Sequence, residues 1–388
     1  MVTYVRYWGS DFRHPHADRA WITLMDGLAR AGWKPYLVCS APAAPSEIAD
    51  RIREVGTEIV YLPRARRNFD AACVWRVRQL CRHLHCDIIH CDNMHTSPLL
   101  GAALAGVPAR LWSKRSMSLA YETMREPTWR DRAAPSIRVS SWLATKVLAV
   151  STAVKEELVH LGIPSSKLLV LPNAVELSRG ESGTRAQTRA SLGYADGEIV
   201  FTAVGHAVPV KGWDVLVRAF AGLVKTCPAA RLQLVGSVTG AQEQEHHAHL
   251  QRCVRERGIA DWVRFRGHQS DITRILEASD VFVLPSRSEG YGNVLIEAMM
   301  CGLPCIATRV GCATDVIQDG VNGLIVARGS VEELHNAMVS LATEPGRRDR
   351  ITHAVRTRDQ YAPTVSEYAE QLVEICRSLL QQTGQAVQ

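Results

Sequence analysis

The sequence predicts an α/β protein of two doubly wound, parallel-sheet domains, and three observations lead to this fold class. The 388 residues are enough for about two domains of ordinary size. Hydrophobic residues make up 46% of the chain, as in proteins that bury globular cores. Short apolar runs alternate with amphipathic stretches, which is the pattern of consecutive βαβ units.

In the first half, short apolar runs predict strands that are separated by helical patterns. The predicted strands are Thr3–Tyr7, Pro35–Cys39, Glu58–Leu62, Asp87–Cys91, Arg110–Trp112, Lys146–Val150 and Leu168–Leu171. Helical patterns between them include Ala17–Ala31, Ala71–His85 and Thr152–Leu161. A glycine follows two of these patterns, at Gly32 and Gly162, as is typical of a helix C-terminus.

The alternation pauses at residues 177–197, a polar, glycine-containing stretch that we interpret as a linker. It then restarts with predicted strands at Ile199–Val204, Arg231–Val235, Val263–Phe265, Val281–Leu284, Pro304–Ala307 and Gly323–Val326. Residues 1–176 and 198–362 are therefore the two predicted domains, and residues 363–388 are expected to form a final helix that docks elsewhere. Parallel sheets bind ligands beyond the carboxyl ends of their strands, so two sheets that face each other predict a ligand in the cleft between them.

The composition argues against several protein classes. Eleven cysteines without a Cys-x-x-Cys pair favour free thiols in a reducing cytosol over a disulfide framework. The first residues lack the basic and then apolar pattern of a signal peptide, and no apolar run approaches the roughly 20 residues of a spanning helix. We therefore expect a cytoplasmic protein, at most peripheral at the inner face of a membrane.

The net charge of +6 is unevenly distributed along the chain. Residues 1–176 carry 23 Lys and Arg against 16 Asp and Glu, while the remainder carries 22 against 23. A solvated basic surface explains this excess, and so does attraction to an anionic membrane, a lipid-linked phosphate or an acidic glycan. Trp75 lies beside Arg76 and Arg78, and Trp129 has similar neighbours; such pairs suit lipid headgroups and ordinary cation–π packing equally. A nucleic-acid partner is not expected, because no zinc finger, helix-turn-helix or aromatic–basic repeat is present.

The most informative segment is Ser286–Ala307, where a strand leads through a glycine-containing turn into a helical pattern. Glycines at 290 and 292 allow a ligand close to the backbone, and a helix N-terminus offers unpaired amides, a combination that suits a diphosphate. Glu289 in the turn and Glu297 in the helix are eight positions apart and suit the hydroxyls of an extended ligand. Both acids have an ordinary alternative as solvated residues, but Glu297 lies among apolar residues and is expected to have a partner.

A second glycine turn, Val204–Trp213, also follows a strand and precedes a helix. Lys211 lies near the start of that helix, where the helix dipole disfavours a cation unless an anion is close. There is no Gly-Lys-Ser or Gly-Lys-Thr, so a Walker-type nucleotide site is not indicated.

These motifs resemble the retaining glycosyltransferases of family 4, which have the GT-B fold of two facing Rossmann-like domains. The resemblance covers the second half and, more weakly, the first. The segments that carry it are Val204–Gly212, Leu234–Gly236, Val263–His268 with Asp271, Ser286–Pro304 and Asn322–Val326, and in the first half Asp87–His90, Val150–Ser151 and Pro172–Glu176.

The resemblance implies a donor site for a nucleotide-diphosphate sugar such as a UDP- or GDP-sugar. Lys211 is implied to neutralise the diphosphate, Glu289 to bind sugar hydroxyls and Glu297 to hold the ribose, with Lys211 and Glu289 as the catalytic pair. The base is implied to lie near Gly267 and His268, and the final helix to cross back onto the first domain. The other implied donor-binding residues are Gly205, His206, Gly236, Gly290, Tyr291, Gly292, Asn293 and Val294.

The chain departs from the family pattern at several positions. His206 follows Gly205 where the family usually has Arg, and a neutral imidazole is a weaker phosphate partner. On the acceptor side, a loop from Gly9 to His16 replaces the usual glycine-pair loop. The acceptor-side candidates are Gly9, His16, His90, His95 and Arg115.

We therefore predict a retaining hexosyltransferase acting on a glycan or glycolipid in polysaccharide, lipopolysaccharide or other cell-envelope synthesis. No cofactor and no metal are expected, because the chain has no Asp-x-Asp pair. A nucleotide-sugar epimerase or phosphorylase on the same fold, and an inactive donor-binding subunit, are the alternatives. The Cys and His residues between Cys81 and His95 are not expected to bind zinc, and His246, His247 and His249 are expected to be solvated.

Overall fold

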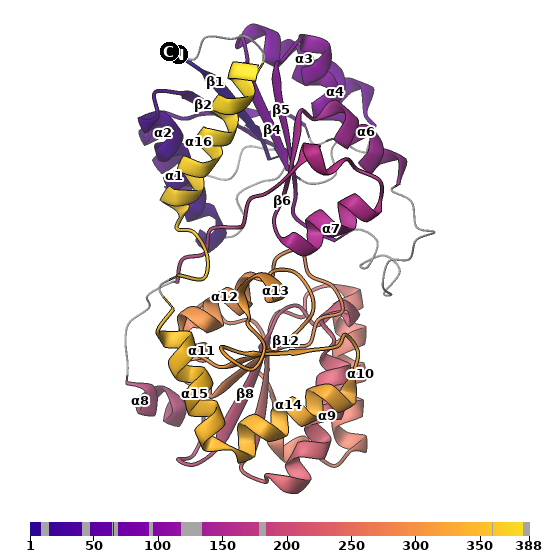
Figure 1. The fold of residues 1–388 in the computed structure, drawn as a ribbon, viewed down its shortest axis with the longest axis vertical. Coiled ribbons are helices and arrows are strands. Elements are labelled where there is room, and N and C mark those ends of the chain that lie inside the picture. The colour runs from indigo at the N-terminus through magenta and orange to yellow at the C-terminus, as the bar shows by residue number, and fades with distance from the viewer. Residues whose placement is uncertain are drawn as a thin grey trace. The chain divides into compact units, whose positions relative to one another are not determined.

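The computed structural model describes residues 1–8, 15–40, 47–63, 65, 69–92, 96–117, 134–177, 184–358 and 360–382, without the side chains of residues 15–20 and 47. The chain forms two compact units (Figure 1). The first contains the chain up to Ser116, the stretch that ends at Ala174, and the part that begins at Pro363. The second contains Val175–Ala362.

The first unit is built on a seven-stranded sheet in the order β3-β2-β1-β4-β5-β6-β7, and every pair in it is parallel. Its strands are β1 (Thr3–Tyr7), β2 (Lys34–Cys39), β3 (Glu58–Tyr61), β4 (Ile88–Asp92), β5 (Ala109–Lys114), β6 (Lys146–Ala149) and β7 (Leu168–Val170). Its helices are α1 (Pro15–Arg30), α2 (Glu47–Glu54), α3 (Ala71–His83), α4 (Thr96–Ala105), α6 (Pro135–Leu143), α7 (Thr152–His160) and α16 (Val365–Gln382), with a 3-10 turn at Ser165–Lys167. In the register of the sheet, Val5 lies opposite Tyr36 of β2 and Ile89 of β4.

The second unit is built on a six-stranded parallel sheet in the order β10-β9-β8-β11-β12-β13. Its strands are β8 (Ile199–Val204), β9 (Ala230–Val235), β10 (Val263–Phe265), β11 (Val281–Leu284), β12 (Cys305–Thr308) and β13 (Leu324–Val326). Its helices are α8 (Arg185–Ser191), α9 (Trp213–Thr226), α10 (Ala241–Glu256), α11 (Ile272–Glu277), α12 (Asn293–Met300), α13 (Ala313–Val316), α14 (Val331–Thr343) and α15 (Pro345–Arg356), with 3-10 turns at Pro209–Lys211 and Ala260–Trp262.

The predicted fold class, two doubly wound parallel-sheet domains, is confirmed. Strands β1, β8, β10 and β11 have the predicted bounds, and the other strands differ by one or two residues at one or both ends. The sheet orders put β1 and β8 in the middle of their sheets, with the strand order reversing beside them. In such sheets the loops after the strands on either side of the reversal form the ligand site.

The final helix α16 belongs to the core of the first unit. Its apolar stripe, with Tyr368, Leu372 and Cys376, lies in one buried cluster with residues of α1 and the sheet. Gly27 of α1 permits the close contact, because a Cβ atom there would lie 2.7 Å from Cβ of Ala369.

The segment predicted as a linker contains a helix. Helix α8 begins with a capping box in which the side chains of Thr184 and Gln187 bind each other's backbone amides. Arg185 and Arg189 then bind the two carboxylate oxygens of Asp280, at 2.7 and 2.9 Å, and so hold α8 on the second unit. The described residues 184–197 therefore pack with the second unit.

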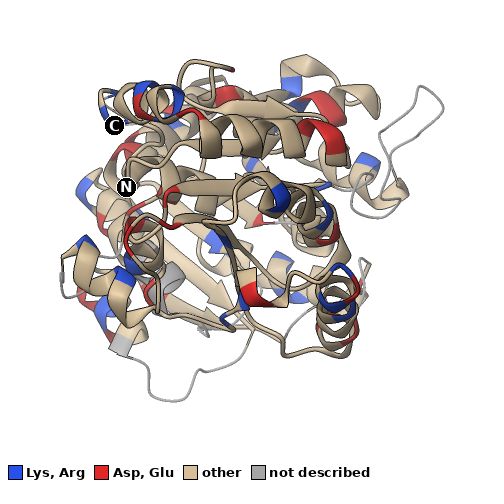
Figure 2. Cartoon of the chain, turned by 90° about the horizontal axis from the view of Figure 1, so that it is seen from below, with Lys and Arg blue, Asp and Glu red and all other residues tan. Residues whose placement is uncertain are grey.

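All eleven cysteines are free. Charged residues of both signs are spread over many of the helices and loops (Figure 2). Among the described residues, no helix is both long enough and apolar enough to cross a membrane.

Candidate active site

Three glycines form a floor at the carboxyl edge of the second sheet. Gly205, Gly236 and Gly267 follow β8, β9 and β10, which are neighbours in the sheet. The amide of Gly236 donates to the carbonyl oxygen of Gly267 at 2.8 Å. A Cβ atom on Gly236 would lie 1.6 Å from the carbonyl oxygen of Gly205, so only glycine fits there. This glycine floor exposes peptide backbone where a side chain would otherwise cover it.

Lys211 and Glu289, predicted from two separate motifs, are brought into contact. Lys211 Nζ lies 2.7 Å from Glu289 Oε1, and both side chains are mostly buried. Lys211 comes from the loop after β8 and Glu289 from the loop after β11, and these two strands are paired. Ser286 Oγ donates to the same oxygen of Glu289 at 2.7 Å, a contact that the sequence analysis missed.

The ion pair with Glu289 removes one reason to expect a bound anion beside Lys211. Glu289 already provides the anion that the position of Lys211 near a helix start was expected to require. An ammonium group has three donors, however, and in the part of the chain described by the structure only the bond to Glu289 is seen. Lys211 therefore keeps capacity for a further acceptor.

An arginine clamp holds the two loops together. Arg287 binds both carboxylate oxygens of Asp214 at 2.7 Å and the carbonyl oxygen of Pro209 at 2.6 Å. Its amide also donates to the carbonyl of Val210 at 2.7 Å. Burial would raise the pKa of Asp214, but the bonds from Arg287 outweigh it and keep that pKa below its usual value. The clamp fixes Lys211 against Glu289. In the sequence, only the position of Arg287, two residues before Glu289, could have indicated this clamp.

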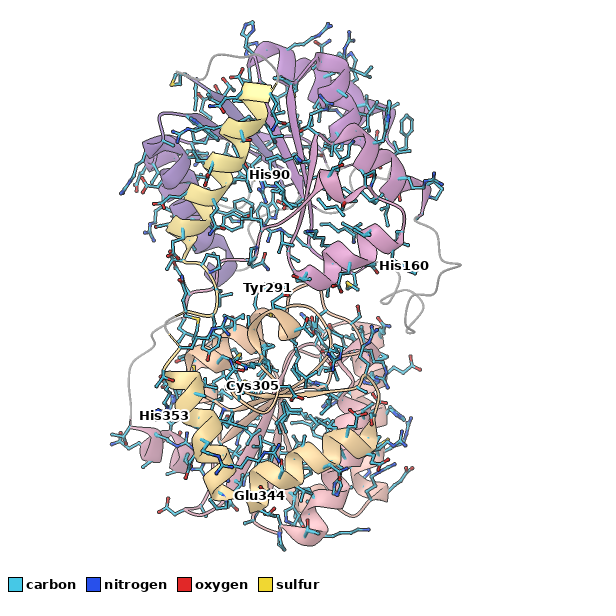
Figure 3. The ribbon with its side chains drawn as sticks, in the orientation of Figure 1. His90, His160, Tyr291, Cys305, Glu344 and His353 are labelled. Atoms are coloured by element: carbon cyan, nitrogen blue, oxygen red, sulfur yellow. The ribbon has the colours of Figure 1, made fainter. Side chains whose placement is uncertain are left out.

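The turn from Gly290 to Val294 leads into helix α12. Gly292 has φ 91°, a left-handed conformation that favours glycine, and no side chain caps the start of the helix. Tyr291 is buried, and its carbonyl oxygen accepts a bond from the amide of Cys312 at 2.8 Å (Figure 3). Burial also raises the pKa of the Tyr291 hydroxyl. The helix start is therefore rigidly supported and suited to an anion.

Glu297 lies on α12 among apolar residues, as the sequence indicates, but the expected partner is missing. Within the described residues, no hydrogen bond or ion pair reaches its carboxylate. Burial raises the pKa of Glu297, because a charged carboxylate is poorly solvated there. Glu297 is partly buried, and acids that are poorly solvated and lack a partner among the described residues gather at functional sites.

His206 is held by two groups that the sequence analysis missed. Its Nδ1 lies 2.9 Å from Glu243 Oε1 and 3.0 Å from Ser237 Oγ. The other oxygen of Glu243 accepts bonds from the amides of Gly240 and Thr239, and these bonds lower the pKa of Glu243 to about 2. Glu243 is therefore a fixed anion that orients the imidazole. His268 is exposed at the end of β10.

On the acceptor side, Arg115 is oriented at the carboxyl edge of the first sheet. It donates to Asp92 Oδ1 at 2.9 Å and to Asn173 Oδ1 at 3.1 Å, and a third of its side chain is exposed. Gly9 and His95 lie outside the described residues, as does the side chain of His16.

His90 is wrongly predicted as an acceptor contact. Its ring is fully buried within the first unit (Figure 3). The ring bonds Tyr4 at 2.8 Å and Ser113 at 2.7 Å, and burial together with the charge of Arg6 lowers its pKa well below the usual value. The side chain therefore has a structural role.

The expectation that His246 and His247 are solvated is wrong. His246 is buried because α10 packs on the rest of the second unit. The ring of His247 packs edge-on against the ring of Phe265, with 4.9 Å between the ring centroids. Burial lowers the pKa of His246. Across the described residues there is no group of three or more His, Cys, Asp or Glu that could hold a metal ion.

Comparison with known families matches both halves of the chain. A family model described as Glycosyl transferases group 1 matches residues 184–358. A second model, described as Glycosyltransferase Family 4, matches residues 17–179.

The curated relatives of the chain include D-inositol 3-phosphate glycosyltransferases. The D-inositol 3-phosphate glycosyltransferase of Actinosynnema mirum is 32% identical over 257 residues, which are 65% of this chain and 61% of that protein. The matches span only about half to three-fifths of the length of such relatives.

Among solved structures, the Anabaena protein HepE in complex with UDP and glucose has a TM-score of 0.76 at 20% identity, covering 97% of this chain and 99% of that one. WaaG, a glycosyltransferase involved in lipopolysaccharide biosynthesis, has a TM-score of 0.68 at 17% identity, covering 97% and 99%. At these identities the likeness shows the fold.

Proposed function

Because this chain belongs to glycosyltransferase family 4, we propose that it transfers a hexose from a nucleotide-diphosphate sugar to a glycan or glycolipid acceptor, with retention of anomeric configuration. The observation that carries this proposal is the contact of Lys211 with Glu289 beside the glycine floor. In that contact Lys211, a cation suited to a diphosphate, lies beside Glu289, an acceptor for sugar hydroxyls, at the carboxyl edge of the second sheet.

The donor is arranged along the sheet edge in the order of the strands. The base lies near Gly267 and His268, after β10. The diphosphate lies over the glycine floor near Lys211 and the start of α12, where a cation and the positive end of the helix dipole favour an anion. The sugar lies at Glu289, after β11. HepE, which has the same fold, is seen with UDP, and this supports a nucleotide-containing ligand for this chain.

The ribose gives Glu297 the partner that the described residues do not supply. A carboxylate is a strong acceptor for two adjacent hydroxyls, and bonds to charged groups are stronger than neutral ones. Donor binding would therefore give hydrogen-bond partners to a partly buried acid that is poorly solvated in the ligand-free chain.

Catalysis rests on stabilising the leaving group. Negative charge grows on the nucleoside diphosphate as the bond to the sugar breaks. Lys211 and the amides at the start of α12 are in place before the reaction, so they stabilise that charge without reorganising. The lysine and the helix end take the role that a divalent metal has in enzymes with an Asp-x-Asp pair.

His206 contributes a phosphate contact in place of the family's usual Arg. Glu243 and Ser237 hold Nδ1 of the ring, so Nε2 is the ring nitrogen that remains for the ligand.

On the acceptor side, we propose that Arg115 contacts an anionic group. Asp92 and Asn173 fix its guanidinium while leaving part of it exposed. The relatives named for D-inositol 3-phosphate support a phosphate-bearing acceptor, and the fold shared with WaaG supports a role in cell-envelope glycan synthesis.

The proposal is tested by screening UDP- and GDP-sugars for thermal stabilisation, followed by assays of transfer and donor hydrolysis. A ligand that binds only the folded state raises its stability. Lys211→Ala should weaken donor binding by about tenfold to a hundredfold, as expected for a lost charged hydrogen bond. Lys225→Ala, an exposed lysine on α9, should leave binding unchanged.

The outcomes separate the alternatives. Donor binding without hydrolysis or transfer would indicate an inactive subunit, and recovery of an epimerised nucleotide sugar would indicate an epimerase. Unchanged donor affinity in Lys211→Ala would place the diphosphate elsewhere.

A further inference from the structure

Helices α3, α4 and α6 form one continuous layer on the first unit (Figure 1). α3 packs on α4 and α4 packs on α6. Side-chain bonds join them: Ser97 Oγ accepts the amide of Asp70 at 2.8 Å, and Thr96 Oγ1 lies 2.9 Å from Ser140 Oγ. The outward side of this layer is called the α3–α4–α6 face below.

The α3–α4–α6 face exposes an unusual number of large apolar side chains. The described residues contain nine exposed large hydrophobic side chains, and five of them lie on these helices or directly before α3. Trp75 is 60% exposed and Trp142 is 75% exposed. The other three are Phe69, Leu104 and Val139. Tryptophans are usually well buried, so two exposed ones on adjoining helices indicate a surface that meets something.

The charge on the same helices has one sign. The sequences of α3, α4 and α6 contain no Asp or Glu, whereas many other helices carry both signs (Figure 2). Asp70, directly before α3, accepts bonds from the amides of Ala72 and Cys73 at the start of that helix. Arg76, Arg78 and Arg82 lie on α3, and Arg138 lies on α6. The tryptophans are therefore interleaved with cations that have no acid on their own helices.

Two further cations lie at the end of α6, beside Trp142. Lys167 Nζ donates to the carbonyl oxygens of Ser141, Trp142 and Ala144, at 2.9, 3.2 and 3.0 Å. Arg110 Nε donates to the carbonyl oxygen of Leu143 at 2.7 Å. These bonds fix the positive charges around the last turn of α6, next to the most exposed tryptophan of the chain's described part.

We propose that the α3–α4–α6 face docks the protein onto the headgroups of an anionic lipid bilayer. Tryptophan is favoured at the headgroup level, where its ring is partly in apolar surroundings and its N–H meets water. Arginines beside it are attracted to anionic headgroups within about one Debye length of the surface. Both features are present on one rigid layer of the fold, and the inference does not depend on the proposed transfer reaction.

The charges argue against the other occupants of such a face. A second copy of this chain docking through the same face would bring arginines against arginines, because a twofold interface places equal surfaces together. A protein partner would have to supply acids for every arginine, and would keep binding when the membrane is absent. These alternatives are outcomes of the test.

The test is co-sedimentation of the full chain with vesicles of phosphatidylglycerol and phosphatidylcholine, compared with phosphatidylcholine alone. The chain should bind only the anionic vesicles, and binding should fall by at least about tenfold when salt rises from about 0.05 M to about 0.5 M, because screening shortens the reach of the charges. Absent binding, or equal binding to both vesicle types, would overturn the proposal.

Two double variants locate the surface. Arg76→Glu with Arg138→Glu should reduce binding to anionic vesicles by about tenfold or more. Trp75→Ser with Trp142→Ser should reduce it as well, through loss of the interfacial rings. The controls are Arg218→Glu with Arg252→Glu and Val159→Ser with Val321→Ser, which change exposed residues elsewhere in the same way. The melting temperature of each variant should equal that of the parent chain, so that a loss of vesicle binding does not reflect unfolding.

The controls also decide the occupant. Equal losses in the test and control pairs would overturn the assignment to this face. Concentration-dependent self-association that the Trp75→Ser, Trp142→Ser pair abolishes, without vesicle binding by the parent chain, would instead assign the face to a second copy and reject the lipid.

Discussion

The carboxyl edges of the two sheets both carry charged side chains, but the two clusters differ in how well their members are satisfied. In the first unit, Arg6 and Asp92 are almost fully buried and paired through two bonds, of 2.9 and 2.7 Å, and Arg115 adds a third. In the second unit, Glu289 takes its bonds from Lys211 and Ser286 on a single oxygen. Glu297 has no bond within the described part of the chain.

The completeness of hydrogen bonding distinguishes charges that stabilise the fold from charges that can still bind a ligand. Burying an ion is costly, and an excellent pair with further hydrogen bonds offsets that cost. In the first cluster the buried pair Arg6 and Asp92 meets this condition internally, so removing either of these two side chains damages the fold. The second cluster leaves bonding capacity unused, so removing one member damages binding or catalysis.

The largest effect is expected from Glu289→Gln. Losing the carboxylate removes the counter-charge of Lys211 and the acceptor for sugar hydroxyls, and transfer should slow by roughly a hundredfold to a thousandfold, as when one preorganised group is lost. The melting temperature should change little, because the cluster is not fully committed to the fold. Steady-state transfer kinetics measure this, with Glu332→Gln, an exposed acid on α14, as the control. Near-normal turnover would remove Glu289 from the mechanism.

The next effect is on stability, from Asp92→Asn. The change leaves Arg6 buried without its counter-charge, and breaking such a pair costs about 3–5 kcal/mol of unfolding free energy. Asp50→Asn removes an equally short but exposed pair with Arg53 and should cost at most about 1 kcal/mol. Denaturant titrations measure both variants. Similar losses would contradict the distinction between the two clusters.

The Asp92 effect should also depend on pH. Burial would raise the pKa of Asp92, but the charges of Arg6 and Arg115 outweigh it and hold that pKa well below its usual value. A lowered pKa gives stability that is present above the ordinary Asp value of about 3.9 and is lost as pH falls towards the folded-state value. The gap between the parent chain and Asp92→Asn should therefore narrow in strong acid.

The smallest effect is expected from Glu297→Gln, and it should have opposite signs on stability and on binding. Burial raises the pKa of Glu297, so its contribution to stability is present at low pH and is lost as pH rises through the folded-state pKa. Gln avoids that loss, so the ligand-free variant should melt slightly higher at neutral pH.

Nucleotide affinity of the same variant should fall by about tenfold, because a charged hydrogen bond to the ribose is replaced by a neutral one. Calorimetric titration with UDP and GDP measures this change. A variant that is both less stable and unchanged in affinity would show that Glu297 belongs with the structural charges.

Local patterns determined the strands and the two glycine motifs, because apolar periodicity and turn residues act within a few positions of the chain. Of the four strands with the predicted bounds, β8 lies between Gly197 and Gly205, and β11 lies between Asp280 and Pro285. The same local reasoning missed helix α8 within residues 177–197, since α8 is held by Asp280, which lies about ninety positions away. It also placed His90 at a binding surface, although the direction of a strand side chain depends on which sheet face is covered.

The sequence by itself thus determined the fold class, the family resemblance and the candidate pair Lys211 and Glu289. Only the tertiary structure decided that these two side chains meet at 2.7 Å, that Arg287 clamps their loops and that Glu243 holds His206. It also decided which tryptophans are exposed. The physical reason is that local sequence sets backbone preferences, whereas contacts and burial depend on the order in which distant strands pair and helices cover them.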